Sequence, residues 1–157
     1  MTTLSQDDAL NFTDVLPLLD EYRAQEALGA QFFGAWVDVC DDAHLRGGLR
    51  TIALREASHV RLLTDRIKVL GGAVEAELAD TGMIEQFGSR EMSDAEKLAG
   101  FMQTIGSIDA VIGRLGEIAA MLDGDPDARG VLDTIIEDEQ ASLNFLSDAC
   151  QRLNAGA

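Results

Sequence analysis

Two stretches of the chain lead into motifs whose residue types could hold a metal ion. Residues 46–56 read RGGLRTIALRE and open a Glu-x-x-His motif that ends at His59. Residues 129–139 read RGVLDTIIEDE, align with the first stretch without a gap, and open a Glu-x-x-Ser motif that ends at Ser142. Residues three positions apart share one face of a helix, so the Glu and His of the first motif would point the same way.

Each half of this repeat also carries an earlier acid. The same alignment pairs Glu26 with Asp109, and each of them precedes the acid of its own motif by thirty positions. Carboxylate oxygens with one imidazole nitrogen suit iron or manganese, and zinc also accepts such ligands. The sequence therefore predicts a centre of one or two metal ions, iron first, with five ligands: Glu26, Glu56, His59, Asp109 and Glu139.

Helices must position these residues, because the apolar residues around them recur at three-and-four spacing. We expect an all-α protein, since 157 residues suffice for one core. After an N-terminal extension over residues 1–13, the spacing predicts four helices that form two antiparallel hairpins, with a long crossover over residues 71–93 between the hairpins. The predicted helices span residues 14–41, 43–70, 94–123 and 126–153.

The predicted helix ends carry the residue types that terminate helices. Gly71 and Gly72 readily supply the left-handed conformation that ends a helix. Ser93 and Glu96 have the spacing of a capping box, and Pro126 stands at a first helical position, where a missing N–H costs little. The N-cap residues that we predict are Asp14, Asp42, Ser93 and Asp125.

Antiparallel hairpins would bring the two acids of each half to the same height. The chain climbs and descends by nearly equal numbers of residues, at about 1.5 Å per residue, so Glu26 lies level with Glu56 and Asp109 with Glu139. Packing the apolar stripes together then buries four carboxylates, which costs several kcal/mol apiece when uncompensated, against a domain stability of roughly 5–15 kcal/mol. No lysine or arginine occupies the stripes at that height, so a bound cation is the predicted counter-charge.

This pattern resembles a known family. With Glu26 on the first helix, Glu-x-x-His on the second, an acid on the third and Glu-x-x-Ser on the fourth, the chain is similar to the ferritin-like di-iron carboxylate proteins over residues 14–153. The thirty-residue spacing and the run from Glu26 to Phe33 look most like the rubrerythrin-like branch. The resemblance implies a ferritin-like four-helix bundle.

The resemblance also implies roles and an activity. It implies bridging ligands at Glu56 and Glu139, terminal ligands at Glu26 and Asp109, and His59 completing one ion. The implied function is oxidoreductase or ferroxidase-like, with iron reacting with peroxide or dioxygen and an external electron donor supplying electrons. Two alternatives stay open: an iron-sequestering protein without turnover, and a structural or stress-associated bundle whose metal site has degenerated.

Two residues depart from the family's pattern. Asp109 is one methylene shorter than the usual Glu, and Ser142 replaces the second histidine, which weakens the second metal position. His44 lies about three helical turns from the predicted site and cannot substitute. Tyr22, one turn before the first acid, reads as core or as a hydrogen-bonding partner for a ligand, and Asp138 reads as solvated surface.

Charge and cysteine content limit the remaining classes. The net charge is −16, from 28 acidic and 12 basic residues, and repels phosphate backbones and anionic lipids. Nucleic acids and membranes are therefore not expected partners, whereas metal ions are, and we expect a homodimer. Cys40 and Cys150 form no C-x-x-C pair, so the chain has no rubredoxin-type centre of its own. No stretch reads as a signal peptide or a membrane span, which predicts a cytoplasmic location.

Overall fold

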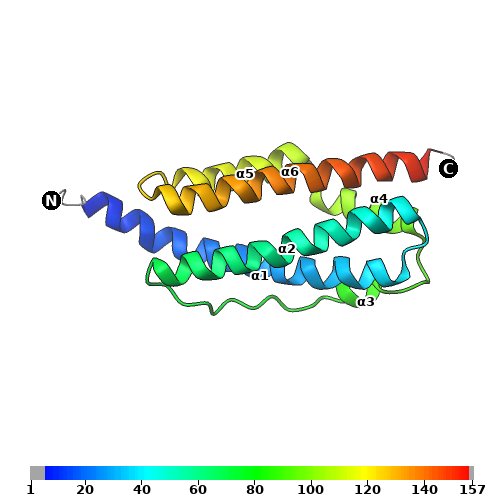
Figure 1. The fold of residues 1–157 in the computed structure, drawn as a ribbon, viewed down its shortest axis with the longest axis horizontal. Coiled ribbons are helices and arrows are strands. Elements are labelled where there is room, and N and C mark those ends of the chain that lie inside the picture. Colours follow the sequence, from blue (N-terminus) through cyan, green and yellow to red (C-terminus); the bar gives the residue numbers. More distant parts are fainter. Residues whose placement is uncertain (1–5, 156–157) are drawn as a thin grey trace.

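Helices make up most of the chain. The computed structural model describes the backbone of residues 6–155 and the side chains of residues 15–155. Within that range the chain forms six helices and no strand (Figure 1), which confirms the predicted all-α class. The helices are α1 (Gln6–Val39), α2 (Ala43–Val69), α3 (Met83–Phe87), α4 (Asp94–Ile105), α5 (Ile108–Ala120) and α6 (Pro126–Asn154). Each helix of this range is too short or too polar to cross a bilayer.

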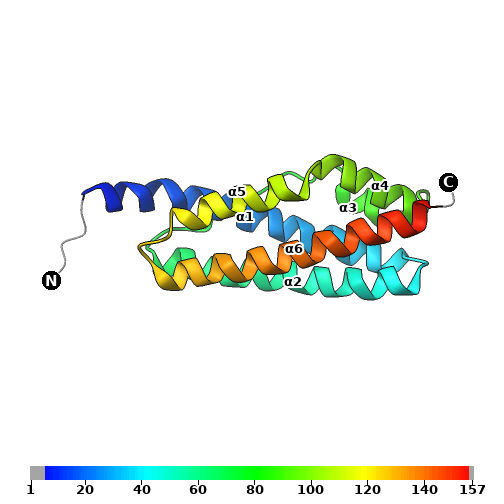
Figure 2. The same ribbon diagram turned by 90° about the horizontal axis from the view of Figure 1, so that it is seen from above.

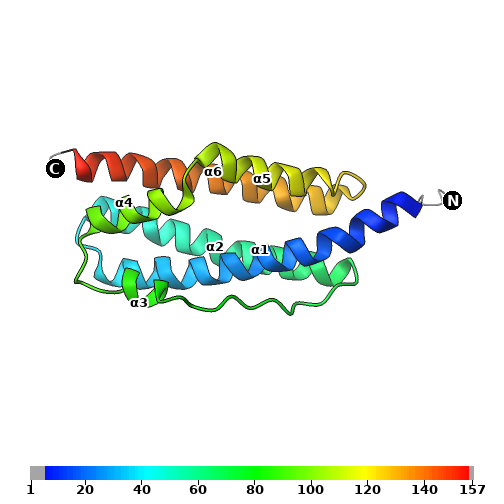
Figure 3. The same cartoon turned by 180° about the vertical axis from the view of Figure 1, so that it is seen from behind.

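The helices pack as two antiparallel groups. The long helices α1 and α2 form one hairpin, and α4 and α5 lie end to end along α6 in the other group (Figures 1 and 2). The segment between α2 and α4 runs beside α1 but not along its N-terminal turns, and it includes α3, which packs on α1 (Figure 3). Helix α6 also contacts α2, whereas α1 has few close backbone contacts with α4 and α5. The seams between α1 and the α4 and α5 helices are therefore loosely packed.

Three of the predicted N-caps are confirmed. Asp42 accepts a hydrogen bond from the Leu45 backbone N–H (2.8 Å) at the start of α2. Ser93 and Glu96 form both hydrogen bonds of a capping box at the start of α4. Asp125 accepts from two backbone N–H groups at the start of α6. These ends are local features, because a short polar side chain satisfies N–H groups that lack a partner in the first helical turn.

The predicted start of the first helix is wrong. Helix α1 begins at Gln6, so its backbone passes through position 14, and most of the predicted extension over residues 1–13 is helical. Pro17 lies inside the helix instead of in its first turn. A proline removes one backbone hydrogen bond, but extending a helix that already exists costs less than nucleating a new one. Residues 1–5 and the Asp14 side chain lie outside the described part.

The predicted third helix is interrupted. Helix α4 ends at Ile105 and α5 begins at Ile108, because Gly106 adopts a positive φ of 70° and Ser107 caps a new helix by accepting from the Ala110 N–H (3.2 Å). Glycine reaches this left-handed region without the penalty that a side chain imposes. The prediction of one helix over residues 94–123 is therefore wrong, and Asp109 falls in the exposed first turn of α5.

Two apolar clusters flank the middle of the molecule. The first lies near the turn between α1 and α2 and includes Trp36, Leu49 and Leu98, each of which is 0 % exposed. The second lies at the opposite end and includes Leu19 and Ile67. Between them along α1 and α2 stand the buried polar side chains that form the candidate site. Apolar packing on both sides thus holds these polar groups in place.

Substitutions at the adjacent glycines Gly47 and Gly48 of α2 test how closely α2 and α6 approach each other. A Cβ added at Gly48 would lie 2.0 Å from the Phe145 ring, whereas one added at Gly47 would meet nothing within 4 Å. We expect Gly47→Ala to stabilise the protein by up to about 1 kcal/mol through helix propensity. Gly48→Ala should instead destabilise it by about 1 kcal/mol, because overpacking typically costs 1–3 kcal/mol. Urea unfolding of both variants measures the difference, and equal stabilities would contradict the close approach.

Candidate metal centre

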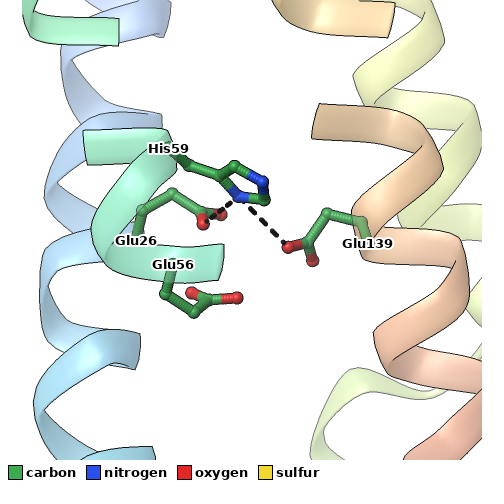
Figure 4. A group of neighbouring side chains, drawn as sticks. All are labelled: Glu26, Glu56, His59 and Glu139. Carbon is green, nitrogen blue, oxygen red and sulfur yellow. Dashed lines mark hydrogen bonds and ion pairs between the residues drawn. The ribbon is translucent and has the colours of Figure 1, made fainter. Parts of the chain in front are cut away.

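Four of the five predicted ligands meet in the interior. Glu26 comes from α1, Glu56 and His59 from α2, and Glu139 from α6, and one ligand atom from each lies within 4.8 Å of all the others (Figure 4). Glu26 is 3 % exposed, Glu56 7 % and His59 0 %. Three helices therefore bring three carboxylates and one imidazole to a single buried point.

The imidazole of His59 connects this cluster to a further acid. Its Nδ1 atom lies 2.9 Å from Glu26 Oε2 and 3.8 Å from Glu139 Oε1, as Figure 4 shows. Its Nε2 atom lies 2.8 Å from Asp138 Oδ2. When Nε2–H donates to Asp138, the other nitrogen can present its lone pair to a metal ion bound among the carboxylates on the cluster side. This is the arrangement in which a metal-binding histidine is oriented by an outer carboxylate.

Asp138 is thus a functional candidate that the sequence interpretation placed on the solvated surface. Its side chain is 33 % exposed and also lies near Arg55, whose Nε atom is 3.7 Å from Asp138 Oδ1. Asp138 and Glu139 are neighbours in the sequence, and both reach His59 of α2 because this side of α6 packs against α2. The run of adjacent acids was the only sequence signal for Asp138. Such a run does not reveal whether a residue faces another helix or the solvent.

The three glutamates crowd negative charge into a site with little water. Burial raises the pKa of Glu56 well above its usual range, and the neighbouring Glu26 and Glu139 raise it further. Burial also raises the pKa of Glu139 to about 7, with Glu26 adding to the effect. Burial lowers the pKa of His59, but hydrogen bonds to Glu26 and Asp138 outweigh it, so the pKa of His59 is raised. Without a cation, the cluster is therefore held together by protons.

The residues fit a single metal ion. Glu139 Oε1 is buried and has no hydrogen-bond partner, and buried polar atoms of this kind usually have one. Metal–oxygen distances of about 2.0–2.6 Å place opposite ligands about 4–5 Å apart, which matches the spread of the four ligand atoms. A cation among them would give Glu139 Oε1 its missing partner and balance the buried charge.

Gly29 makes room for one of these carboxylates. It is buried one turn after Glu26 on α1, and a Cβ at this position would lie 2.4 Å from Glu56 Oε2. The absence of a side chain therefore lets the Glu56 carboxylate lie directly against the backbone of α1.

The residues expected around a second ion do not join the cluster. Asp109 is exposed at the start of α5, so the predicted ligand from the third helix is not beside the others. Ser142 is buried, and its hydroxyl accepts a hydrogen bond from Arg55 Nη1 (3.2 Å). His44 is exposed and lies against Phe145 instead. Of the four candidate ligands, the second half of the repeat thus contributes only Glu139.

A pocket reaches the cluster beside the break between α4 and α5. It has a volume of about 160 Å³, and the three glutamates form part of its lining. The pocket is otherwise mainly apolar, and its wall includes residues from both sides of the break: Phe101, Ile105 and Val111. We expect that a continuous helix in place of α4 and α5 would fill this space. The break therefore leaves an accessible pocket next to the three carboxylates.

Comparisons with protein families, with curated proteins and with solved structures found no match to this chain. The arrangement of side chains therefore carries the functional argument by itself.

Proposed function

We propose that this protein binds a transition-metal ion, iron first, through Glu26, Glu56, His59 and Glu139. The observation that carries the proposal is the burial of three glutamates around one histidine in a chain where none of the three pairs with a lysine or arginine among the described residues. Burying such charges is costly without a counter-ion. Oxygen ligands with one imidazole suit iron or manganese, and zinc is also accepted.

The fold that we propose is a ferritin-like four-helix bundle whose third helix is divided into α4 and α5. The antiparallel α1–α2 hairpin, the long crossover and the position of α6 agree with it. Within this fold, one ion per chain fits better than two, because Asp109 is exposed and Ser142 is hydrogen-bonded to Arg55. Of the two metal positions that the sequence resemblance implies, we therefore propose only the one that His59 completes.

The chemistry that we propose is a reaction with peroxide or dioxygen. A ferrous ion bound in such a site would supply electrons to the oxidant, and an external electron donor would reduce the resulting ferric ion again. The chain's own residues contribute binding and orientation: the glutamates and His59 hold the ion, and Asp138 fixes the imidazole through Nε2. The pocket beside the break gives a small oxidant access while the apolar clusters exclude bulk water.

Metal titration of the chelator-treated protein tests the proposal. We expect saturation at about one Fe²⁺ or Mn²⁺ per chain, with a rise in melting temperature of roughly 5–10 °C at 100-fold excess over the dissociation constant. Consumption of peroxide faster than by free ferrous ion would support turnover. Absence of any stoichiometric binding would sink the proposal, and two equivalent ions per chain would contradict the single-ion geometry.

One alternative has a specific observation in its favour. The exposed Asp109 and the Ser142–Arg55 hydrogen bond leave the site with fewer ligands than a di-iron centre needs, which favours binding without turnover. Stoichiometric binding with no peroxide consumption would assign the protein to this class. The same titration, followed by sedimentation of the loaded protein, tests the expected homodimer.

A further inference from the structure

The pocket beside the glutamates has a neighbour along the seam between α1 and α5. This second pocket has a volume of about 200 Å³ and shares three lining residues with the first, Tyr22, Gln25 and Val111. Its remaining lining also belongs to α1 and α5. The two pockets therefore lie side by side along the seam between α1 and α5.

The inner pocket has the size and lining of a small-molecule site. Its volume of about 160 Å³ is close to the 150 Å³ of an apolar cavity that binds benzene. Phe33 and Phe101 line it with an edge-to-face contact at 5.6 Å between ring centroids, and Leu143 and Leu146 contribute aliphatic surface from α6. Water gains little from such walls, whereas a compact apolar molecule gains contacts with them.

Tyr22 supplies a polar group without a partner. Its hydroxyl is buried and makes no hydrogen bond, although buried hydroxyls are usually paired because desolvation costs free energy. Since Tyr22 lines both pockets, a ligand hydroxyl in the inner pocket can pair with it as donor or acceptor.

The surrounding charge selects among polar ligands. Glu26, Glu56 and Glu139 line the same pocket, and no lysine or arginine does. A carboxylate or phosphate on the ligand would therefore face three acidic side chains and no basic one in this pocket, and a neutral hydroxyl avoids this repulsion. The apolar walls limit the remainder of the ligand to a body about the size of one benzene ring.

We infer that the inner pocket binds a small neutral molecule with a compact apolar body and a single hydroxyl group, which pairs with Tyr22. This binding site goes beyond the proposed metal function and does not depend on it, because Tyr22 and the apolar walls are present without an ion. Val111 lines both pockets, so a larger side chain there would reduce the space for the ligand.

Three matched probes test whether a ligand hydroxyl pairs with Tyr22. Phenol, toluene and benzoate share one ring and differ in the group that would face Tyr22, and their affinities are measured by calorimetry on chelator-treated full-length protein. We expect phenol to bind roughly tenfold more tightly than toluene, as one buried hydrogen bond provides. Benzoate should bind at least about tenfold more weakly than phenol. In Tyr22→Phe, the preference for phenol over toluene should disappear while toluene binding is retained.

A space-filling variant tests the location. Val111→Phe should weaken phenol and toluene alike by at least about tenfold, because the added ring volume occupies part of the inner pocket that Val111 lines. Val60→Phe introduces the same change on α2 outside both pockets and should leave both affinities unchanged, with circular dichroism confirming that each variant is folded.

Failure of this inference is distinguishable from failure of the metal proposal. Equal affinities of phenol and toluene for the wild-type protein would overturn the role of Tyr22. Unchanged binding in Val111→Phe, or no saturable binding of any probe, would overturn the site even if the protein binds metal stoichiometrically. Probe binding by a protein that takes up no metal would support the pocket and refute the metal centre.

Discussion

Raising the pH from about 5 to about 8 should destabilise the metal-free protein and stabilise the metal-loaded protein, so that their melting temperatures diverge. In the metal-free state, Glu139 has a pKa of about 7 against an ordinary value of 4.5. Below the ordinary value, Glu139 is protonated whether the chain is folded or not. Between the two values the folded state keeps a proton that the unfolded state has lost, so stability falls as the pH rises through about 7.

Two further groups act in the same direction. The pKa of Glu56 is also raised by burial and by the neighbouring glutamates, so its ionisation in the folded state also costs stability. The raised pKa of His59 means that its charged form stabilises the fold at low pH and that this contribution is lost as the pH rises through the folded-state pKa. Together these groups account for on the order of 3 kcal/mol, which corresponds to a fall in melting temperature of roughly 10 °C.

A bound ion reverses the slope. Metal ions compete with protons for carboxylates and imidazole, so metal affinity increases with pH. A ligand at 100 times its dissociation constant adds about 2.7 kcal/mol to the stability of the folded state. Scanning calorimetry with chelator and with excess Mn²⁺ across the pH range measures both slopes. Parallel curves would show that no ion binds these groups.

Glu139→Gln should lower metal affinity by at least about 100-fold, since removal of even an outer partner of a ligand commonly costs 10–100-fold. The same variant should stabilise the metal-free protein near pH 8, because it removes one of three buried like charges. Loss of binding together with a gain in stability would distinguish a ligand from a residue that merely supports the fold. Competition with a chromophoric chelator measures the affinity, and calorimetry measures the stability.

Asp109→Asn provides the matched control. The sequence pattern pairs Asp109 with Glu26, but the structure places Asp109 in the exposed first turn of α5, away from the cluster. This variant should leave metal affinity unchanged within about a factor of two, as expected of an exposed carboxylate outside the site. A loss of affinity comparable to that of Glu139→Gln would instead indicate that α5 joins the site when metal is bound.

Most of the candidate site could be predicted from the sequence, because its causes are local. Glu26, Glu56 and Glu139 each sit in the middle of an apolar stripe, and the spacing of such a stripe determines which face of a helix is buried. The cap at Asp42 determines where α2 starts, so equal rises along α1 and α2 bring Glu26 level with Glu56. These features need only helix geometry and the patterns of neighbouring residues.

Asp138 and Asp109 show where local patterns were insufficient. Both are acids beside or within a predicted stripe, yet Asp138 meets His59 and Asp109 faces solvent. The outcome at Asp138 depends on how closely α6 approaches α2, and Gly48 is one residue that permits this approach. The spacing of residues within one helix reveals neither how closely α6 approaches α2 nor where α5 places Asp109.

The sequence by itself thus determined an all-α chain, three of its helix starts and the meeting of three glutamates with one histidine. Tertiary structure alone decided that the helix breaks at Gly106, that Asp109 leaves the site and that a pocket opens next to Tyr22. The physical reason is energetic. A glycine within a helix costs only about 1 kcal/mol relative to alanine, so packing between helices determines whether the helix continues.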